Sequence, residues 1–199
     1  MSIDLDNLRI VVPQYLSLER QKGLVAELEQ LSGATNFFST TPPYPLLQGD
    51  VWCELPVYDP ATAKSKRIKG LVLSNSCDIS ADNTRFLPVK VSFSPLVSVA
   101  KYQEVLKQAG WDAGRIENHL SDLRRQAITS LMYIPASPYL GEEYIALLSD
   151  IHSVSLAEFD SGQQAKRLSS FNNVGFYVLL FKLAVHFCRM HEGVDRDAH

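Results

Sequence analysis

The stretch GDVWCELPVYDPATAKSKRIKGLVL, residues 49–73, decides the fold. Its first ten residues, 49–58, have the composition of a β-strand, and the polar run from Asp59 to Lys66 is typical of a turn-prone loop. The strongly apolar segment Gly70 to Leu73 then predicts a second strand. The stretch therefore predicts two neighbouring strands joined by a polar loop.

The chain after this stretch continues the β pattern and adds helices. Residues 86–93 predict a third strand, and three short strands with polar connections are typical of a meander in a small barrel or half-open sheet. Residues 101–128 repeat apolar side chains at helical spacing, with a break at Gly110. Further short strands are predicted at residues 131–134, 144–148 and 152–156.

Helices are predicted at both ends of the chain. Ser17 can cap a helix that Gly33 ends, so residues 1–44 are expected to form an N-terminal helical extension. Residues 172–190 predict a long helix that is apolar on nearly every side. Such a helix is buried, either by other helices of the same chain or by a second copy or a companion protein, and both alternatives stay open.

These elements predict one α+β domain over residues 1–199, with a small β-barrel and a helical insertion within residues 45–199. The composition, 46% hydrophobic and 21% charged, is sufficient for a real core. A net charge of −3 argues against a surface built for indiscriminate DNA binding, which needs many cations that face phosphate.

The spacing of the cysteines and the absence of known motifs limit the kinds of site that the sequence predicts. Cys53, Cys77 and Cys188 show no CxxC spacing, which favours free thiols in a reducing cytoplasm. The N-terminus lacks the pattern of a signal peptide, and no segment is long and apolar enough to predict a membrane span. No HExxH, GxGxxG or Walker motif occurs, so the sequence predicts neither a metal site nor a cofactor.

A cluster of cations precedes the second predicted strand. Lys64, Lys66, Arg67 and Lys69 repel one another unless solvent or phosphate neutralises them. An arginine at this position can bind phosphate with two parallel hydrogen bonds or stabilise the negative charge that develops in phosphoryl transfer. The alternative is a solvated hairpin tip, and the sequence leaves both interpretations open.

The apolar strand runs directly into small polar residues, LSNSCDIS, at residues 73–80. Ser74, Asn75, Cys77 and Asp78 would be held rigidly at a strand end, which is typical of binding sites. The alternative is a turn in which the Asn and Asp side chains bond to the backbone. A weaker hypothesis makes Cys77 a nucleophile, although the sequence places no histidine beside it to stabilise a thiolate.

Three motifs in this order resemble the PemK/MazF family of RNA-cleaving toxins. They are GDVW at residues 49–52, SKRIKGLVLSN at 65–75, and LLSDIHSVSLAEF at 147–159 followed by Arg-Leu-Ser-Ser at 167–170 and the final helix. The resemblance covers about residues 49–97 and 144–189. The NSCD string, the N-terminal helix and the helical insertion lie outside the family pattern.

The resemblance implies an SH3-like barrel and a dimer that binds single-stranded RNA in a groove between the copies. It also implies metal-independent cleavage, in which an arginine and a hydroxyl side chain assist attack by the RNA's own 2′-hydroxyl. By position, Arg67 lies near the family's arginine and Ser92 near its hydroxyl residue. This chain has Ile68-Lys69-Gly70 after the arginine, where the family has Arg-Pro directly before the strand.

The leading hypothesis is a PemK/MazF-like protein that binds or cleaves single-stranded RNA, in a toxin–antitoxin or phage-defence setting. Its expected catalytic residues are Arg67 and Ser92. The alternative hypothesis is a non-catalytic interaction module that uses the barrel and the apolar C-terminal helix. The expected nucleic-acid-binding residues are Lys64, Lys66, Lys69, Ser74, Asn75, Cys77 and Asp78.

Overall fold

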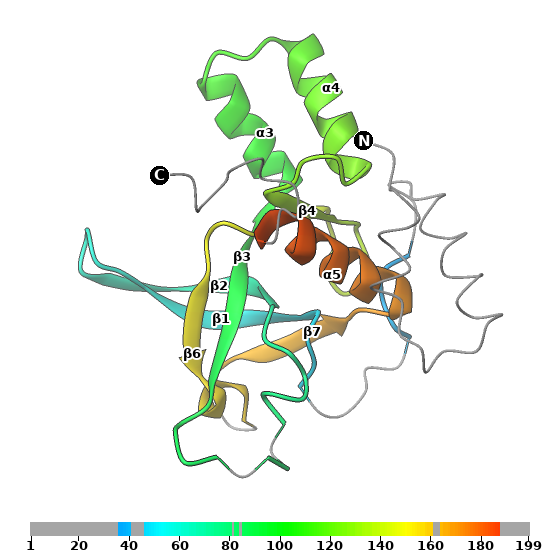
Figure 1. The fold of residues 1–199 in the computed structure, drawn as a ribbon. Helices are drawn as coiled ribbons and strands as arrows, with labels where there is room; N and C mark the ends of the chain where they lie inside the picture. Colours follow the sequence, from blue (N-terminus) through cyan, green and yellow to red (C-terminus); the bar gives the residue numbers. More distant parts are fainter. Residues whose placement is uncertain (1–35, 41–45, 81, 84, 161–163, 188–199) are drawn as a thin grey trace, which may run out of the picture.

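A computed structural model describes residues 36–40, 46–80, 82–83, 85–160 and 164–187 (Figure 1). The described chain is α+β, as the sequence predicts. Its elements are β1 (Asp50–Asp59), β2 (Lys64–Val72), β3 (Lys90–Ser98), α3 (Val99–Gln108), α4 (Ala113–Arg124), β4 (Leu131–Ile134), β5 (Tyr144–Leu147), β6 (His152–Ser155), the 3-10 helix η1 (Leu156–Phe159), β7 (Lys166–Ser170) and α5 (Asn173–Phe187).

The strands form one antiparallel sheet with the order β4-β5-β3-β2-β1-β7. The predicted meander is confirmed, because β1 pairs with β2 and β2 pairs with β3. Strand β3 is long enough to pair with β6 through its first half and with β5 through its second half. Among the described residues this path stays open, since no pairing returns from β7 to β4 or β6.

Strands β2 and β3 differ most from the prediction, and strand β7 is not among the predicted strands. Strand β2 begins at Lys64, because Asp59 closes a tight turn by accepting bonds from the Ala61 N–H and the Thr62 hydroxyl, both at 2.9 Å. The predicted loop therefore ends three residues early, and the basic cluster lies within a strand. Strand β3 covers Lys90–Ser98 instead of residues 86–93, so the run from Phe86 to Val89 belongs to the loop before it.

A bulge in β1 explains how the core residues of this strand are spaced. The register with β2 shifts between Trp52 and Leu55, and Glu54 has a positive φ of 59°. Residues three apart in a regular strand face opposite sides, yet Trp52 and Leu55 belong to the same hydrophobic cluster. The bulge turns both side chains toward that cluster.

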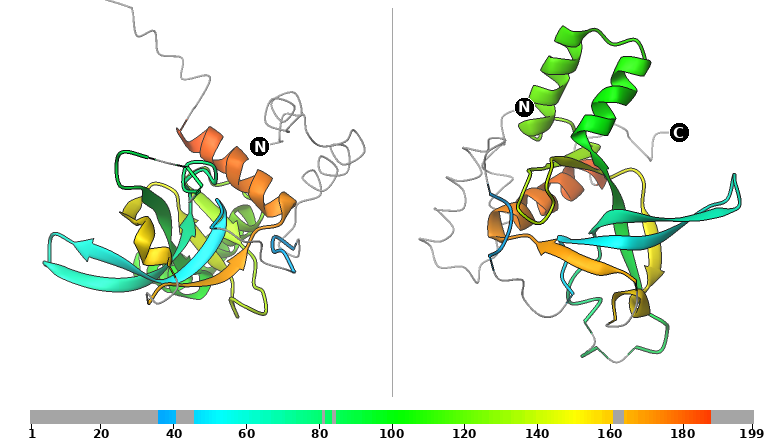
Figure 2. Two further views of the ribbon diagram at one scale, coloured as in Figure 1. Left: turned by 90° about the horizontal axis from the view of Figure 1, so that it is seen from below. Right: turned by 180° about the vertical axis from the view of Figure 1, so that it is seen from behind.

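The core consists of three clusters. The first lies between the sheet and α5, the second packs β1 and β3 against β6 and η1, and the third packs α3 and α4 on β4 and β5. Figures 1 and 2 show α5 lying across the sheet, while the α3–α4 pair and the β1–β2 hairpin project from it. Leu71 and Leu179 belong to the first cluster, and Leu55 and Phe93 belong to the second. Leu123 and Ile145 belong to the third.

The predicted helical insertion is confirmed as α3 and α4, and an ion pair holds it to the sheet. Arg124 donates to both carboxylate oxygens of Glu143, from Nε at 2.9 Å and from Nη2 at 2.8 Å. The Tyr133 hydroxyl donates to the same carboxylate at 2.6 Å. Arg124 is the main reason that the pKa of Glu143 lies below its usual range. The helices therefore have a fixed attachment to β4 and β5.

Helix α5 carries a buried lysine. Lys182 is 2% exposed, and its Nζ donates to the backbone carbonyls of Gln126, at 3.1 Å, and Ile128. Burial lowers the pKa of Lys182 to about 8. These bonds attach α5 to the connection after α4.

The predicted C-terminal helix is confirmed to residue 187, and residues 188–190 lie outside the described residues. The predicted N-terminal helix, residues 17–33, lies outside them as well. No helix of the described ranges has the length and apolarity needed to cross a membrane.

Candidate nucleic-acid interface

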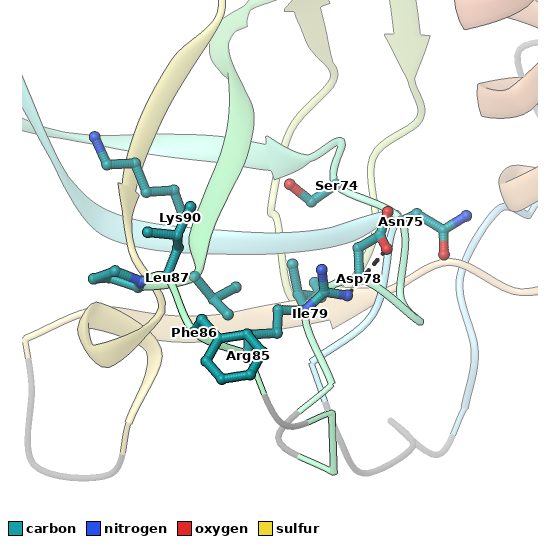
Figure 3. Close-up of a pocket in the computed structure, with 10 residues that line it drawn as sticks. Ser74, Asn75, Asp78, Ile79, Arg85, Phe86, Leu87 and Lys90 are labelled. Carbon is teal, nitrogen blue, oxygen red and sulfur yellow. Dashed lines mark hydrogen bonds and ion pairs between the residues drawn. The ribbon is translucent and has the colours of Figure 1, made fainter.

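The loop between β2 and β3 forms an open pocket of about 690 Å³ (Figure 3). One wall comes from the small polar string that follows β2, and the other comes from the residues that lead into β3. The lining residues are Ser74, Asn75, Asp78, Ile79, Arg85, Phe86, Leu87, Pro88, Val89 and Lys90.

The first wall is a turn that is attached to β3. The Ser74 hydroxyl accepts the Ser92 N–H at 2.8 Å, and the Ser92 carbonyl accepts the Leu73 N–H at 2.9 Å. The Asn75 side-chain oxygen accepts the Cys77 N–H at 2.9 Å, which closes an Asx turn. The predicted turn is thus present, and three of its polar side chains still line a pocket. Cys77 is exposed and lies outside the lining set.

The second wall combines an aromatic ring with cations. Phe86 is 106% exposed and Leu87 is 79% exposed, so neither side chain contributes to the core. Arg85 lies beside the ring, and its Nη2 is 3.1 Å from an oxygen of Asp78. Lys90 is also exposed at the start of β3. Adjacent exposed apolar side chains commonly mark interaction sites.

This second wall does not follow from the sequence pattern. The sequence predicts a strand at residues 86–93, and in a strand the side chains of Phe86 and Leu87 would take part in packing against neighbouring strands. A signal was present in the run Arg85-Phe86-Leu87, where a cation stands next to an aromatic residue in an otherwise polar loop. Pro88 directly after this run is an additional signal for a loop.

A polar face continues from the pocket onto the sheet. Ser92 of β3 lies opposite Ser153 of β6, with their hydroxyl oxygens 2.9 Å apart. Lys90 and Ser155 form the next pair on the same face, because side chains alternate along a strand. The structure therefore brings Ser92 together with the Ser74 wall of the pocket.

The basic cluster is divided between two faces of the β1–β2 hairpin. Lys64 and Lys66 lie on one face and Arg67 lies on the other, because alternate residues of a strand point in opposite directions. Arg67 donates to the Glu54 carbonyl at 2.6 Å and lies 3.9 Å from Glu158.

Lys69 is directed to a different part of the sheet. Its Nζ donates to the Tyr144 hydroxyl, and the same atom lies 4.7 Å from the centre of the Tyr144 ring. Two of the four clustered cations, Arg67 and Lys69, thus have partners within the protein. The cluster does not form one phosphate-binding patch.

The two expected catalytic residues lie on neighbouring strands. Ser92 is in β3, and Arg67 is in β2, which pairs with β3. The Arg67 guanidinium lies 3.9 Å from Glu158 of η1, which directly follows β6, the strand that pairs with Ser92. Their joint contact with one phosphate group stays a prediction.

Two of the motifs quoted in the sequence analysis contact each other, through residues that do not line the pocket. Asp50, from the GDVW motif, is fully buried, and its Oδ2 accepts bonds from the Leu47 N–H at 3.0 Å and from Arg167 at 3.3 Å. Burial is the main cause that raises the pKa of Asp50. Arg167 belongs to the Arg-Leu-Ser-Ser motif on β7, so these motifs hold β1 and β7 together.

No group of three His, Cys, Asp or Glu side chains within the described ranges could hold a metal ion.

No protein-family model matches the sequence, and no curated protein matches it.

Proposed function

We propose that this protein is a PemK/MazF-like protein that binds single-stranded RNA in the pocket between Ser74 and Lys90. The observation that carries the proposal is the fully exposed ring of Phe86 in a pocket that the cations Arg85 and Lys90 also line. Surfaces for single-stranded nucleic acid combine these parts, because an aromatic ring stacks on a base while cations contact the backbone.

The other wall of the pocket supplies hydrogen-bonding groups. Ser74 and Asn75 present a hydroxyl and an amide at the pocket. Bases of a single strand expose their edges to such groups, whereas a duplex hides those edges in base pairs. A local site of this kind is compatible with the net charge of −3, because it needs few phosphate contacts.

The proposal is limited to binding. Cleavage of the kind that the family resemblance implies needs an arginine and a hydroxyl at one phosphodiester, and that arrangement of Arg67 and Ser92 stays a prediction. We likewise propose that the open sheet is related to an SH3-like barrel. The β1-β2-β3 meander and the helix after β7 support this relation.

Removing the two cations of the pocket tests the proposal. We expect the double variant Arg85→Ala/Lys90→Ala to bind a fluorescein-labelled eight-residue oligouridine more weakly than the wild type, measured by fluorescence anisotropy. The slope of log affinity against log salt should also fall, by about 0.7 for each phosphate that a cation no longer neutralises. Arg85 is a surface ion-pair partner of Asp78, so its removal should change stability little.

The matched control is Lys101→Ala/Arg125→Ala, which removes two exposed cations from α3 and from the end of α4. This variant should bind as the wild type does. Equal weakening by both double variants, or the absence of saturable binding by the wild type, would contradict the proposal.

A second candidate function is association through α5, with a second copy of the chain as the partner. Phe176, Leu180, Leu183 and Phe187 follow the spacing i, i+4, i+7 and i+11, which places them on one helical face. The first three are only partly buried, and Phe187 is 53% exposed.

Size-exclusion chromatography with light scattering tests this second candidate. We expect a dimer for the wild type and a monomer for Phe187→Asp, because a charge on this face opposes burial against a partner. Val105→Asp is the control, since Val105 is 52% exposed on α3, and it should remain dimeric. A wild type that stays monomeric at high concentration would contradict association with a second copy.

A further inference from the structure

Asp78 is the one carboxylate among the ten residues that line the pocket. A carboxylate repels phosphate, so it weakens a surface that binds only the RNA backbone. Its partner in the structure, Arg85, donates a hydrogen bond to it, and a bound group with further donors fits the same carboxylate.

The surroundings of Asp78 orient its carboxylate. Oδ1 lies 3.1 Å from Nη2 of Arg85, while the side chain as a whole is 70% exposed. An ionised carboxylate has lone pairs on both oxygens, so Oδ1 and Oδ2 can each accept a further bond. The acceptor lies in the same pocket as Phe86, and Figure 3 shows both side chains at the loop.

We propose that Asp78 makes the site selective for guanine in a bound RNA strand, an inference that rests on the proposed RNA binding. Guanine presents two adjacent donors, N1–H and the N2 amino group, on its pairing edge, and these can bond to the two oxygens of one carboxylate. Uracil offers one N–H between two carbonyl oxygens, which repel a carboxylate. Adenine and cytosine each offer an amino group next to a ring nitrogen that accepts.

The ring of Phe86 completes the recognition. Asn75 is not part of it, because its side-chain oxygen accepts the Cys77 N–H at 2.9 Å and its side chain points away from Asp78 and Phe86 (Figure 3). The exposed Phe86 ring supplies the stacking surface, which is indifferent to base identity. Selectivity therefore depends on Asp78.

The experiment compares four labelled RNA oligomers, UUUXUUUU with X as G, A, C or U, by fluorescence anisotropy. For the wild type we expect the G oligomer to bind about tenfold more tightly than the other three, the range of one two-bond base contact. Asp78→Asn replaces one acceptor by a donor, and the ratio of the G to the U affinity should fall to about one. Thermal melting followed by circular dichroism verifies that the variant is folded.

Asp82→Asn is the matched control, because Asp82 is exposed in the same loop and does not line the pocket. It should keep the preference for G. Equal affinities of the wild type for all four oligomers would overturn the guanine inference and leave RNA binding intact. A G preference that persists in Asp78→Asn would overturn the role of Asp78. The absence of binding to every oligomer would overturn the proposed function itself.

Discussion

The Phe93→Ala variant is expected to lose about 3–5 kcal/mol of unfolding free energy, the range for a fully buried phenylalanine. Phe93 is 0% exposed, and its ring stacks on His152 with the ring centres 5.8 Å apart. The ring also lies directly on β2, since a Cβ added at Gly70 would be 2.5 Å from the Phe93 Cδ2. Removing the ring leaves a cavity that the surrounding strands cannot fill.

Urea denaturation followed by circular dichroism measures this change in stability. The control is Phe86→Ala, which removes the same side chain from a position that is 106% exposed and should change stability by no more than about 0.5 kcal/mol. A decrease below about 1 kcal/mol in Phe93→Ala would contradict the packing described for the second core cluster.

The same Phe86→Ala variant is expected to show the second large effect, on RNA binding. Stacking of one base on an aromatic side chain contributes about 1–3 kcal/mol, so affinity for an oligouridine should fall roughly 5- to 150-fold. Phe86→Tyr keeps the ring and should bind nearly as the wild type does. Fluorescence anisotropy at one fixed salt concentration gives the comparison, because affinities for nucleic acid depend on salt.

Tyr139→Ala is the control for this effect. Tyr139 is 57% exposed in the connection between β4 and β5, away from the residues that line the pocket. Its removal should leave RNA binding unchanged. If Phe86→Ala and Tyr139→Ala bind RNA equally well, the pocket between Ser74 and Lys90 is not the binding site.

Much of the architecture could be predicted from local patterns. The β1-β2-β3 meander, the helical pair α3–α4 and the helix α5 all follow from runs of apolar residues whose period is set within the segment itself. The end of α3 follows from Gly110, whose φ of 81° suits glycine.

The candidate site was predicted only in part. Ser74, Asn75 and Asp78 were identified because they follow an apolar strand directly. Phe86 falls within a predicted strand, since an apolar run before Pro88 has the same composition as the start of a strand, and Arg85 just before it is not among the predicted site residues. Position along the chain gave no sign that these two segments face each other across a pocket.

Sequence alone thus determined most of the strands and helices, because side-chain periodicity over a few residues specifies them. It predicted neither strand β7 nor the loop at residues 86–89. Tertiary structure decided which polar groups meet. Register between strands places Ser92 against Ser153, which is 61 residues away, and it places Arg67 against Pro56. Register depends on pairing between distant segments, and a shift of one residue reverses every face, so no local pattern contains it.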